Sequence, residues 1–359
     1  MRRAKLKLGV RAMSDSRDFI EDPAAVVPDT PEMRHELKQI ASGRCAQFNR
    51  SFPGVDIARE LLREGRPHWF LDLLTLWRPG GQPSEDDGLR LAVRDGYLNF
   101  YRRGQSVAKV SVVRGALRGE VHVKYFSPEA RLSRTQDYGR FEGAHVRGAG
   151  FTALYEGLRT LRAWIPEIDS RYVGTEKRLV DALVAENDNV IDLEMGLPAW
   201  GRIKTAPRMD LVTIEDQQIV FWEAKTAGDS RIRCGVPVVP KAMPHVLDQL
   251  EKYRLFLEQD THCWRVGEAY RSAASVMVGL RQIADELGPR RPLGPEIVAA
   301  STADQLRVAR EAALVVLDEA PPEGARWRSW HAKHAAKLTG HARVLAQSVP
   351  GRLVFGEAV

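Results

Sequence analysis

The spacing of apolar and polar positions divides the chain into segments of different secondary structure. From Asp56 to Trp77 apolar residues recur at helical spacing, with an interruption near Gly65–Pro67, which predicts two helical pieces. Residues 89–126 instead alternate with a period of two around an Asp95-Gly96 pair, a strong hairpin signal. The N-terminal part is therefore expected to form an α+β module with an antiparallel meander.

The pattern changes again after this meander. Residues 127–150 are rich in Arg and Gly and predict an irregular linker or loop. A helical pattern then begins after Phe151, breaks at Pro166, and resumes over residues 174–186. Much further along, the short apolar run Ser275–Leu280 predicts a strand.

One predicted hairpin contains the charged residues that are candidates for a functional site. The sequence RMDLVTIEDQQIVFWEAK places two β-rich runs around the polar stretch EDQQ. With Asp216 and Gln217 as the turn residues, Asp210 lies opposite Glu223, and Lys225 projects from the same face as Glu223. The remaining positions on both faces are mostly apolar, so these charges belong to a strand pair that is buried on both sides.

Two carboxylates opposed in a buried hairpin repel each other unless a cation lies between them. One interpretation is an ordinary ion pair between Lys225 and either Asp210 or Glu223. The other is a functional centre in which the two acids hold a hard divalent cation such as Mg²⁺ and Lys225 orients or helps to activate the attacking water.

The hairpin resembles the signature of the PD-(D/E)XK superfamily of restriction-endonuclease-like nucleases, with Asp210 followed by Glu223-Ala224-Lys225. The Pro-Asp pair is not literal, because Pro207 stands three positions ahead of Asp210. In this family a helix with an acidic residue precedes the hairpin. The helix GTEKRLVDALVAEN offers Glu176 for that role, with Glu186 as the competitor.

The helix expected after the hairpin, HVLDQLEKYRLFLEQ, adds a second element of resemblance. Gln249 and Tyr253 share one face of it and are similar to the QxxxY motif of the RecB-like branch, in which both side chains lie beside the active site and toward the nucleic acid. The resemblance spans roughly residues 170–285.

The resemblance implies an α/β fold with a restriction-endonuclease-like αβββαβ core. The expected organisation is a polar N-terminal arm, an α+β module, a nuclease domain and a helical C-terminal segment, over residues 1–50, 51–130, 150–285 and 286–359.

The same resemblance implies a set of site residues. Glu176, Asp210 and Glu223 are the expected ligands of Mg²⁺, with Mn²⁺ as an alternative, and Lys225, Gln249 and Tyr253 complete the catalytic set. Beyond the hairpin, Arg231 and Arg233 stand in a polar loop. They are candidates for phosphate contacts or, equally, for a solvated loop.

Composition adds little to this interpretation. The 359 residues carry a net charge of +6, which favours a polyanionic partner. The three cysteines are far apart and predict neither a disulfide framework nor a zinc site. No apolar run approaches the length of a membrane span, and a cytoplasmic location is expected.

The resemblance implies Mg²⁺-dependent hydrolysis of phosphodiester bonds by an endonuclease acting on DNA, with RNA left open, in defence against foreign DNA or in DNA repair. The alternative is a catalytically silent nucleic-acid-binding or assembly subunit of a larger defence complex. Partner proteins of that kind, or a homo-oligomer, remain open. Aromatic and Arg residues gather in residues 97–103, where they form either a hairpin core or a surface that stacks on single strands.

Overall fold

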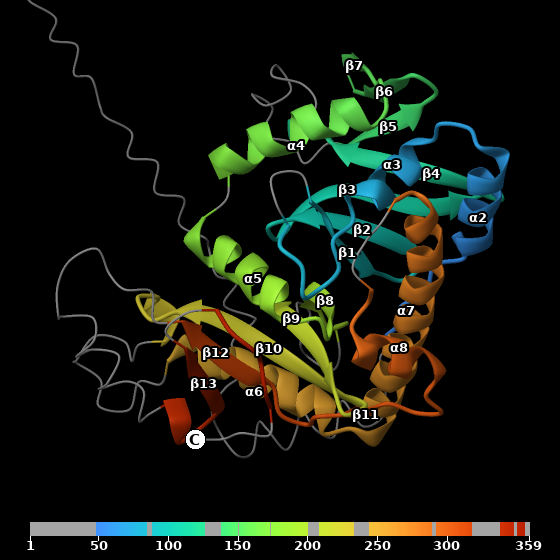
Figure 1. The fold of residues 1–359 in the computed structure, drawn as a ribbon. Helices are drawn as coiled ribbons and strands as arrows, with labels where there is room; N and C mark the ends of the chain where they lie inside the picture. The colour runs from blue at the N-terminus through green and yellow to red at the C-terminus, as the bar shows by residue number, and fades with distance from the viewer. Residues whose placement is uncertain are drawn as a thin grey trace, which may run out of the picture.

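The fold combines two β-sheets with seven α-helices in the part of the chain that the computed structural model describes. That part comprises residues 48–84, 88–125, 138–149, 151–172, 174–199, 208–232, 244–288, 292–317, 338–347 and 350–355. Figure 1 shows the sheets one above the other. The expected mixed α/β class is confirmed. The predicted arm of residues 1–50 lies outside the described residues, apart from its last three.

The first sheet is an antiparallel meander of seven strands in chain order. Its strands are β1 (Arg90–Val93), β2 (Tyr97–Arg102), β3 (Gln105–Val113), β4 (Ala116–His122), β5 (Tyr138–Glu142), β6 (His145–Gly148) and β7 (Phe151–Leu154). The predicted β1–β2 hairpin is present, although only Gly96 of its Asp-Gly turn has a positive φ, of 78°. The 3-10 helix η2 (Val123–Tyr125) follows β4.

The meander extends further than the sequence indicated. Residues 127–150 were expected to form a linker, but β5 and β6 lie within this range. Phe141 and Val146 of these strands are buried in the main core, and Phe141 stacks on Trp69 with ring centroids 4.9 Å apart. Two buried positions separated by a turn are too few to show a clear alternation among so many Arg and Gly residues.

The helices that pack on this sheet match the prediction in part. α2 (Val55–Glu64) and α3 (Trp69–Leu76) are the two expected pieces, and α2 ends at Gly65 in the left-handed conformation. α4 (Leu158–Tyr172) begins after Phe151, which belongs to β7, and continues through Pro166. The predicted break there is wrong, because Leu161 and Ile165 are fully packed in the core before the proline and offset its missing hydrogen bond.

The second sheet has six strands and carries the candidate chemistry. Its strands are β8 (Val190–Gly196), β9 (Arg208–Glu215), β10 (Gln218–Thr226), β11 (Arg307–Val308), β12 (Ala313–Leu317) and β13 (Arg343–Gln347). The order is β13-β12-β10-β9-β8, with β11 also paired to β10. β8, β9 and β10 are antiparallel, whereas β12 and β13 continue the sheet in parallel. β10 is therefore a central strand.

The predicted β9–β10 register is confirmed as far as Leu211, which pairs with Trp222. The turn residues Asp216 and Gln217 have positive φ angles of 48° and 59°, as a two-residue hairpin requires. Beyond that last pair the geometry is more specific than simple opposition. The Asp210 carboxylate accepts a hydrogen bond from the backbone N–H of Ala224 at 2.8 Å.

One prediction in the C-terminal part is wrong, and another holds only in part. The run at Ser275–Leu280, expected as a strand, lies inside α7 (Asp260–Glu286). A short apolar run has no period of its own that separates a strand from a buried helix, and the buried positions of α7 recur at helical spacing. The segment from residue 286 was expected to be helical, and among its described residues α8 (Pro295–Thr302) and residues 338–339 are helical, whereas β11, β12 and β13 join the second sheet. Residues 318–337 lie outside the described residues.

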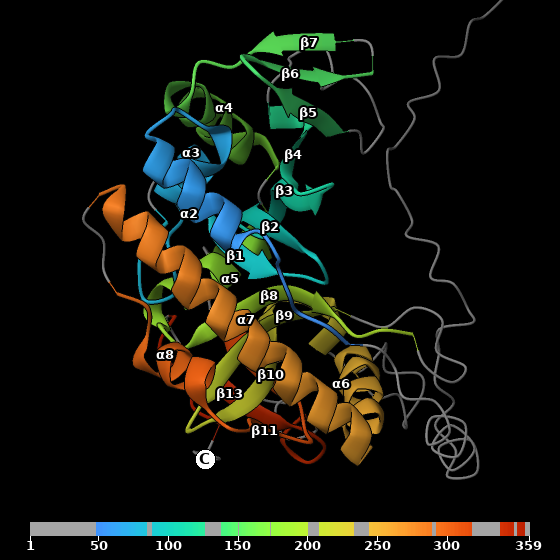
Figure 2. The same cartoon turned by 90° about the vertical axis from the view of Figure 1, so that its right-hand side faces the viewer.

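Helices bury both faces of the second sheet. α5 (Thr175–Glu186) covers one face through Leu179 and Leu183, in a cluster with Trp222. α6 (His245–Leu257) and α7 cover the other, where Phe221 contacts the rings of α6 and α7 residues. Figure 2 shows α7 crossing from α2 at the first sheet to α6 and α8 at the second. One continuous core thus joins both sheets.

A buried charge cluster ties the sheets together. The Asp192 carboxylate of β8 is 1% exposed and forms ion pairs with Arg50 and Arg94. It also accepts a hydrogen bond from the Tyr270 hydroxyl of α7 at 3.0 Å. Arg94 follows β1 and additionally donates to the Leu193 carbonyl oxygen at 2.6 Å. The cluster therefore links β1, β8, α7 and the segment before α2.

Replacement of Asp192 should lower the free energy of unfolding. In Asp192→Ala two guanidinium groups stay buried without their carboxylate, which costs about 3–5 kcal/mol of the free energy of unfolding. Urea denaturation measures this loss. Asp56→Ala is the matched control, because Asp56 pairs with Arg59 at the surface and is 91% exposed. Equal stability of the two variants would contradict a linking role for Asp192.

Candidate active site

The ammonium group of Lys225 lies among three carboxylates at the end of the β9–β10 hairpin. Its Nζ is 3.4 Å from an oxygen of Glu176 and 3.6 Å from Asp210 Oδ2, and it forms a closer ion pair with Glu223 Oε1. It also donates to the Ala224 carbonyl oxygen at 2.8 Å. The side chain is 1% exposed. The structure thus brings together the four charged residues that the sequence selected.

Local structure explains how Glu176 reaches the hairpin. The residue is in the first turn of α5, which begins after Gly174. The partial positive charge of a helix N-terminus favours a carboxylate there. Leu179, Val180 and Leu183 anchor the helix on the sheet, so Glu176 is directed to the strand ends. Glu186, its competitor, is exposed in the last turn of the same helix.

Arg231 borders the cluster from the 3-10 helix η4 (Ser230–Ile232). Its guanidinium forms ion pairs with Glu176 and with Asp229, and the side chain is 48% exposed. Arg231 is therefore at the mouth of the cluster, where a phosphate contact would compete with two carboxylates. Arg233, the second candidate for such contacts, lies outside the described residues.

Gln249 of α6 contacts the carboxylate cluster directly. Its Nε2 donates to Glu223 Oε2 at 2.7 Å and also to the Arg208 carbonyl oxygen. An amide nitrogen has two hydrogens to donate, and here both hold the hairpin. Gln249 therefore fixes the orientation of the Glu223 carboxylate.

Tyr253 has a different position from the one that the resemblance implied. Its side chain is fully buried, and its hydroxyl donates to the Met195 carbonyl oxygen of β8 at 2.8 Å. Its ring packs beside Phe221. A nucleic acid does not reach this position in the described structure. Tyr253 therefore anchors β8 against α6.

Negative charge exceeds positive charge in this cluster. Among the described residues, the ion pairs of Glu176, Asp210, Glu223 and Asp229 are with Lys225 and Arg231. Burial and the neighbouring Asp210 raise the pKa of Glu223 to about 8, against the lowering effect of Lys225. Burial alone would lower the pKa of Lys225, but Asp210 and Glu223 outweigh it and raise that pKa. The surroundings therefore favour the ammonium form of Lys225 and disfavour ionisation of Glu223.

A further carboxylate, Glu194 of β8, belongs to this neighbourhood and was missed from the sequence. Burial and the charge of Asp210 raise its pKa. Its φ is 51°, a left-handed conformation that is unusual for a residue in a strand. The signal available was an acid in the otherwise apolar stretch LEMG, but a single Glu in a strand next to the hairpin has no spacing that distinguishes it.

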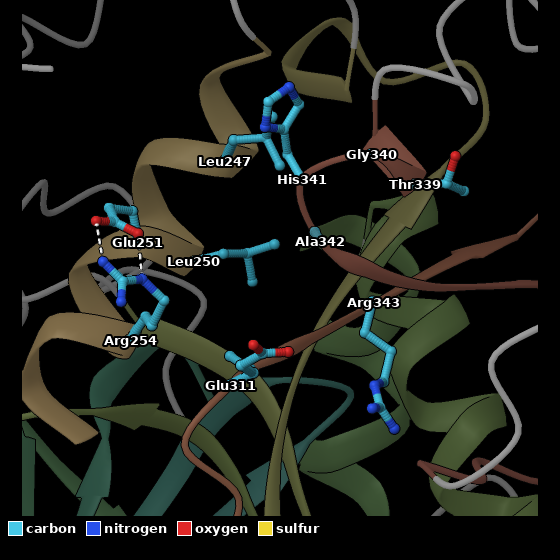
Figure 3. Close-up of a pocket in the computed structure, with 11 residues that line it drawn as sticks. Leu247, Leu250, Glu251, Arg254, Glu311, Thr339, Gly340, His341, Ala342 and Arg343 are labelled. Atoms are coloured by element: carbon cyan, nitrogen blue, oxygen red, sulfur yellow. Dashed lines mark hydrogen bonds and ion pairs between the residues drawn. The ribbon is translucent and has the colours of Figure 1, made fainter. Parts of the chain in front are cut away.

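A separate hollow of 420 Å³ lies between α6 and the segment that leads into β13. Figure 3 shows Glu251 and Arg254 paired with each other on its α6 wall, facing His341 and Arg343 across the opening. The residues around Lys225 do not contribute to its lining. This hollow is thus separate from the carboxylate cluster.

Comparison with known proteins adds no relative to this picture. The chain matches no protein-family model, no curated protein and no solved structure at a significant level. None of the helices in the described ranges is both long and apolar enough to cross a membrane. The geometry of the site is therefore the basis for any functional assignment.

The raised pKa of Glu223 predicts a specific pH dependence of stability. The pKa of Glu223 in the folded protein is above its value in the unfolded chain, so the folded state binds the proton more tightly. The contribution of Glu223 to the free energy of unfolding is therefore complete at low pH and is lost as pH rises toward 8. The slope from this group reaches at most about 1.4 kcal/mol per pH unit. Glu223→Gln removes the titration, so its free energy of unfolding should fall less between pH 5 and 8. Urea denaturation in EDTA measures both profiles, and parallel profiles would contradict the assignment.

Proposed function

We propose that this protein is a divalent-metal-dependent nuclease that hydrolyses phosphodiester bonds. The observation that carries the proposal is the convergence of Glu176, Asp210 and Glu223 on the ammonium of Lys225, all within 3.6 Å. Acids and a lysine in this order are the residues that the resemblance to PD-(D/E)XK nucleases implies. The order α5, β8, β9, β10 and α6 supports the proposal, and the parallel strand β12 joins the sheet only after α7, α8 and β11.

The donor set suits a hard divalent cation. Asp210, Glu223 and Glu176 would hold it, since Mg²⁺ and Mn²⁺ prefer carboxylate oxygens. No group of three or more acidic, His or Cys side chains within the described residues already has the arrangement of a metal site. In this conformation the carboxylate oxygens are engaged by Lys225 and Arg231, yet their charge exceeds that of the two cations. This excess of negative charge is the reason why the site suits an additional cation.

The residues of the candidate site then have distinct roles. When bound, such a cation lowers the pKa of a coordinated water and neutralises charge that develops on the phosphoryl group. Lys225 orients the attacking water and stabilises the negative charge of the transition state. Gln249 keeps the Glu223 carboxylate in one orientation, and Arg231 is placed to receive a phosphate oxygen at the mouth of the site.

DNA is the proposed substrate, and the resemblance is the basis for a role in defence against foreign DNA or in DNA repair. A second candidate function is nucleic-acid binding without cleavage, as a subunit of a larger assembly. The observation in its favour is that Lys225 is 1% exposed and fully engaged by ion pairs, which is also what a purely structural cluster shows.

Cleavage assays separate the two functions. The purified chain should cut plasmid, linear or single-stranded DNA in Mg²⁺ or Mn²⁺ and be inactive in EDTA. Lys225→Ala and Asp210→Ala should each lower the rate on the order of 10²–10³-fold or more, because each removes a group that stabilises transition-state charge. Retained binding with cleavage equal to that of the wild type in these variants would sink the nuclease proposal.

The helix α5 offers an internal comparison for Glu176. Glu176→Gln should lower metal-dependent cleavage by about 10–100-fold, as expected for a perturbed metal environment. Glu186→Gln makes the same change at the exposed end of the same helix and should leave cleavage unaffected. An RNA substrate in parallel tests the alternative substrate. Equal activity of the two variants would remove Glu176 from the site.

A further inference from the structure

A polar cavity of 480 Å³ lies beside the carboxylate cluster, between the two sheets. One wall comes from β2 and β3 of the first sheet and includes Tyr97, Asn99 and Lys109. The opposite wall comes from β8 and β9 of the second sheet, with Glu194 and Arg208. The volume falls in the range of about 300–1,000 Å³ that is typical of small-ligand sites.

The cavity carries an excess of positive charge. Arg50, Arg94, Lys109 and Arg208 line it, against the two acids Asp95 and Glu194. Asp192 lies behind Arg50 and Arg94 and neutralises only one of those two guanidinium groups. Even with Asp192 included, cations outnumber carboxylates, so an anionic ligand is favoured.

The same wall offers flat rings and hydrogen-bonding groups. Tyr97 and Tyr138 both line the cavity and are half-buried. Lys109 Nζ lies 4.4 Å from the centroid of the Tyr138 ring. The buried Asn99 accepts a hydrogen bond from Ser106 Oγ at 2.8 Å. Rings next to cations and an amide form the usual surface for an unpaired base with its phosphate.

This arrangement decides between the two interpretations of residues 97–103. Phe100 is fully buried in the core, and Arg102 is buried with hydrogen bonds to the Ser84 and Gly88 carbonyl oxygens. Tyr101 is buried and accepts a hydrogen bond from Arg94. Most of the stretch is therefore hairpin core. Tyr101 and Tyr97 both line the cavity, but Tyr101 is buried and held by Arg94, whereas Tyr97 is half-buried and more accessible to a ligand.

The cavity and the carboxylate cluster share their border. Arg208 is two residues before Asp210 on β9, which corresponds to about 7 Å along a strand. Its carbonyl oxygen is held by Gln249, which also holds Glu223. Glu194, on the opposite strand, lines the cavity and senses the charge of Asp210. A nucleic-acid strand with one nucleotide in the cavity would therefore reach the carboxylate cluster with its next nucleotide.

We infer that this cavity holds an unpaired nucleotide of the strand whose neighbouring phosphodiester reaches the carboxylate cluster. The inference rests on the proposed nuclease function and makes its substrate single-stranded nucleic acid, or a duplex end with an unpaired nucleotide. Tyr97 and Tyr138 stack on the base, while Lys109 and Arg208 neutralise the flanking phosphates.

Binding assays with fluorescently labelled oligonucleotides in EDTA test this inference without cleavage. The full chain should bind a single-stranded oligonucleotide more tightly than a blunt duplex of the same length. Tyr97→Ala and Lys109→Gln should each weaken single-strand binding about 5- to 10-fold, because a stacked base or a phosphate contact is lost. Tyr97→Phe, which keeps the ring, should restore binding. Blunt-duplex binding should change less than twofold.

The matched control is Arg147→Gln in the same sheet. Arg147 is 59% exposed, pairs with Glu142 and does not line the cavity, so losing its charge should not alter binding. Equal weakening by Arg147→Gln and Lys109→Gln would overturn the inference in favour of general charge attraction. Unchanged single-strand binding in Tyr97→Ala and Lys109→Gln would also overturn it, even if the wild type cleaves DNA. Single-strand binding with these losses but no cleavage in Mg²⁺ or Mn²⁺ would instead remove the nuclease function and leave the binding cavity standing.

Discussion

The buried carboxylate of Asp192 is the constraint on which the arrangement of the two sheets depends. A buried ion requires several well-placed partners, and those of Asp192 come from four separate parts of the chain: Arg50, Arg94, Tyr270 and its own strand. The ion pair and hydrogen bond that Arg94 forms with β8 hold β1 against that strand. Arg50 and Arg94, which hold Asp192, also line the cavity together with Glu194, two residues further along β8.

The protein contains two buried charge clusters with opposite balances. Around Asp192 the guanidinium groups outnumber the carboxylate, whereas around Lys225 the carboxylates outnumber the cations. Each imbalance would cost stability in a protein that only had to fold. Under the proposed function, a polyanion would compensate the cluster around Asp192 and a divalent cation the cluster around Lys225.

The sequence alone predicted the parts of the fold whose signals are local. The hairpin register followed from the turn at Asp216 and Gln217 and from the alternation around it, and α5 and α6 followed from their helical spacing. The strand at residues 313–317 and the helical run at residues 275–280 did not, because an apolar segment takes its structure from what surrounds it. Glu194 and the cavity depend on contacts between segments about 100 residues apart, which no local pattern records.

The two hydrogen bonds of Gln249 have a mechanical consequence. One donor holds a carboxylate of the cluster, and the other holds the backbone at Arg208, on the rim of the cavity. Any ligand that displaces β9 at that rim therefore pulls on the same amide that orients Glu223. If the proposed ligand occupies the cavity, Gln249 would couple its binding to the orientation of Glu223 through one side chain, without movement of either sheet as a whole.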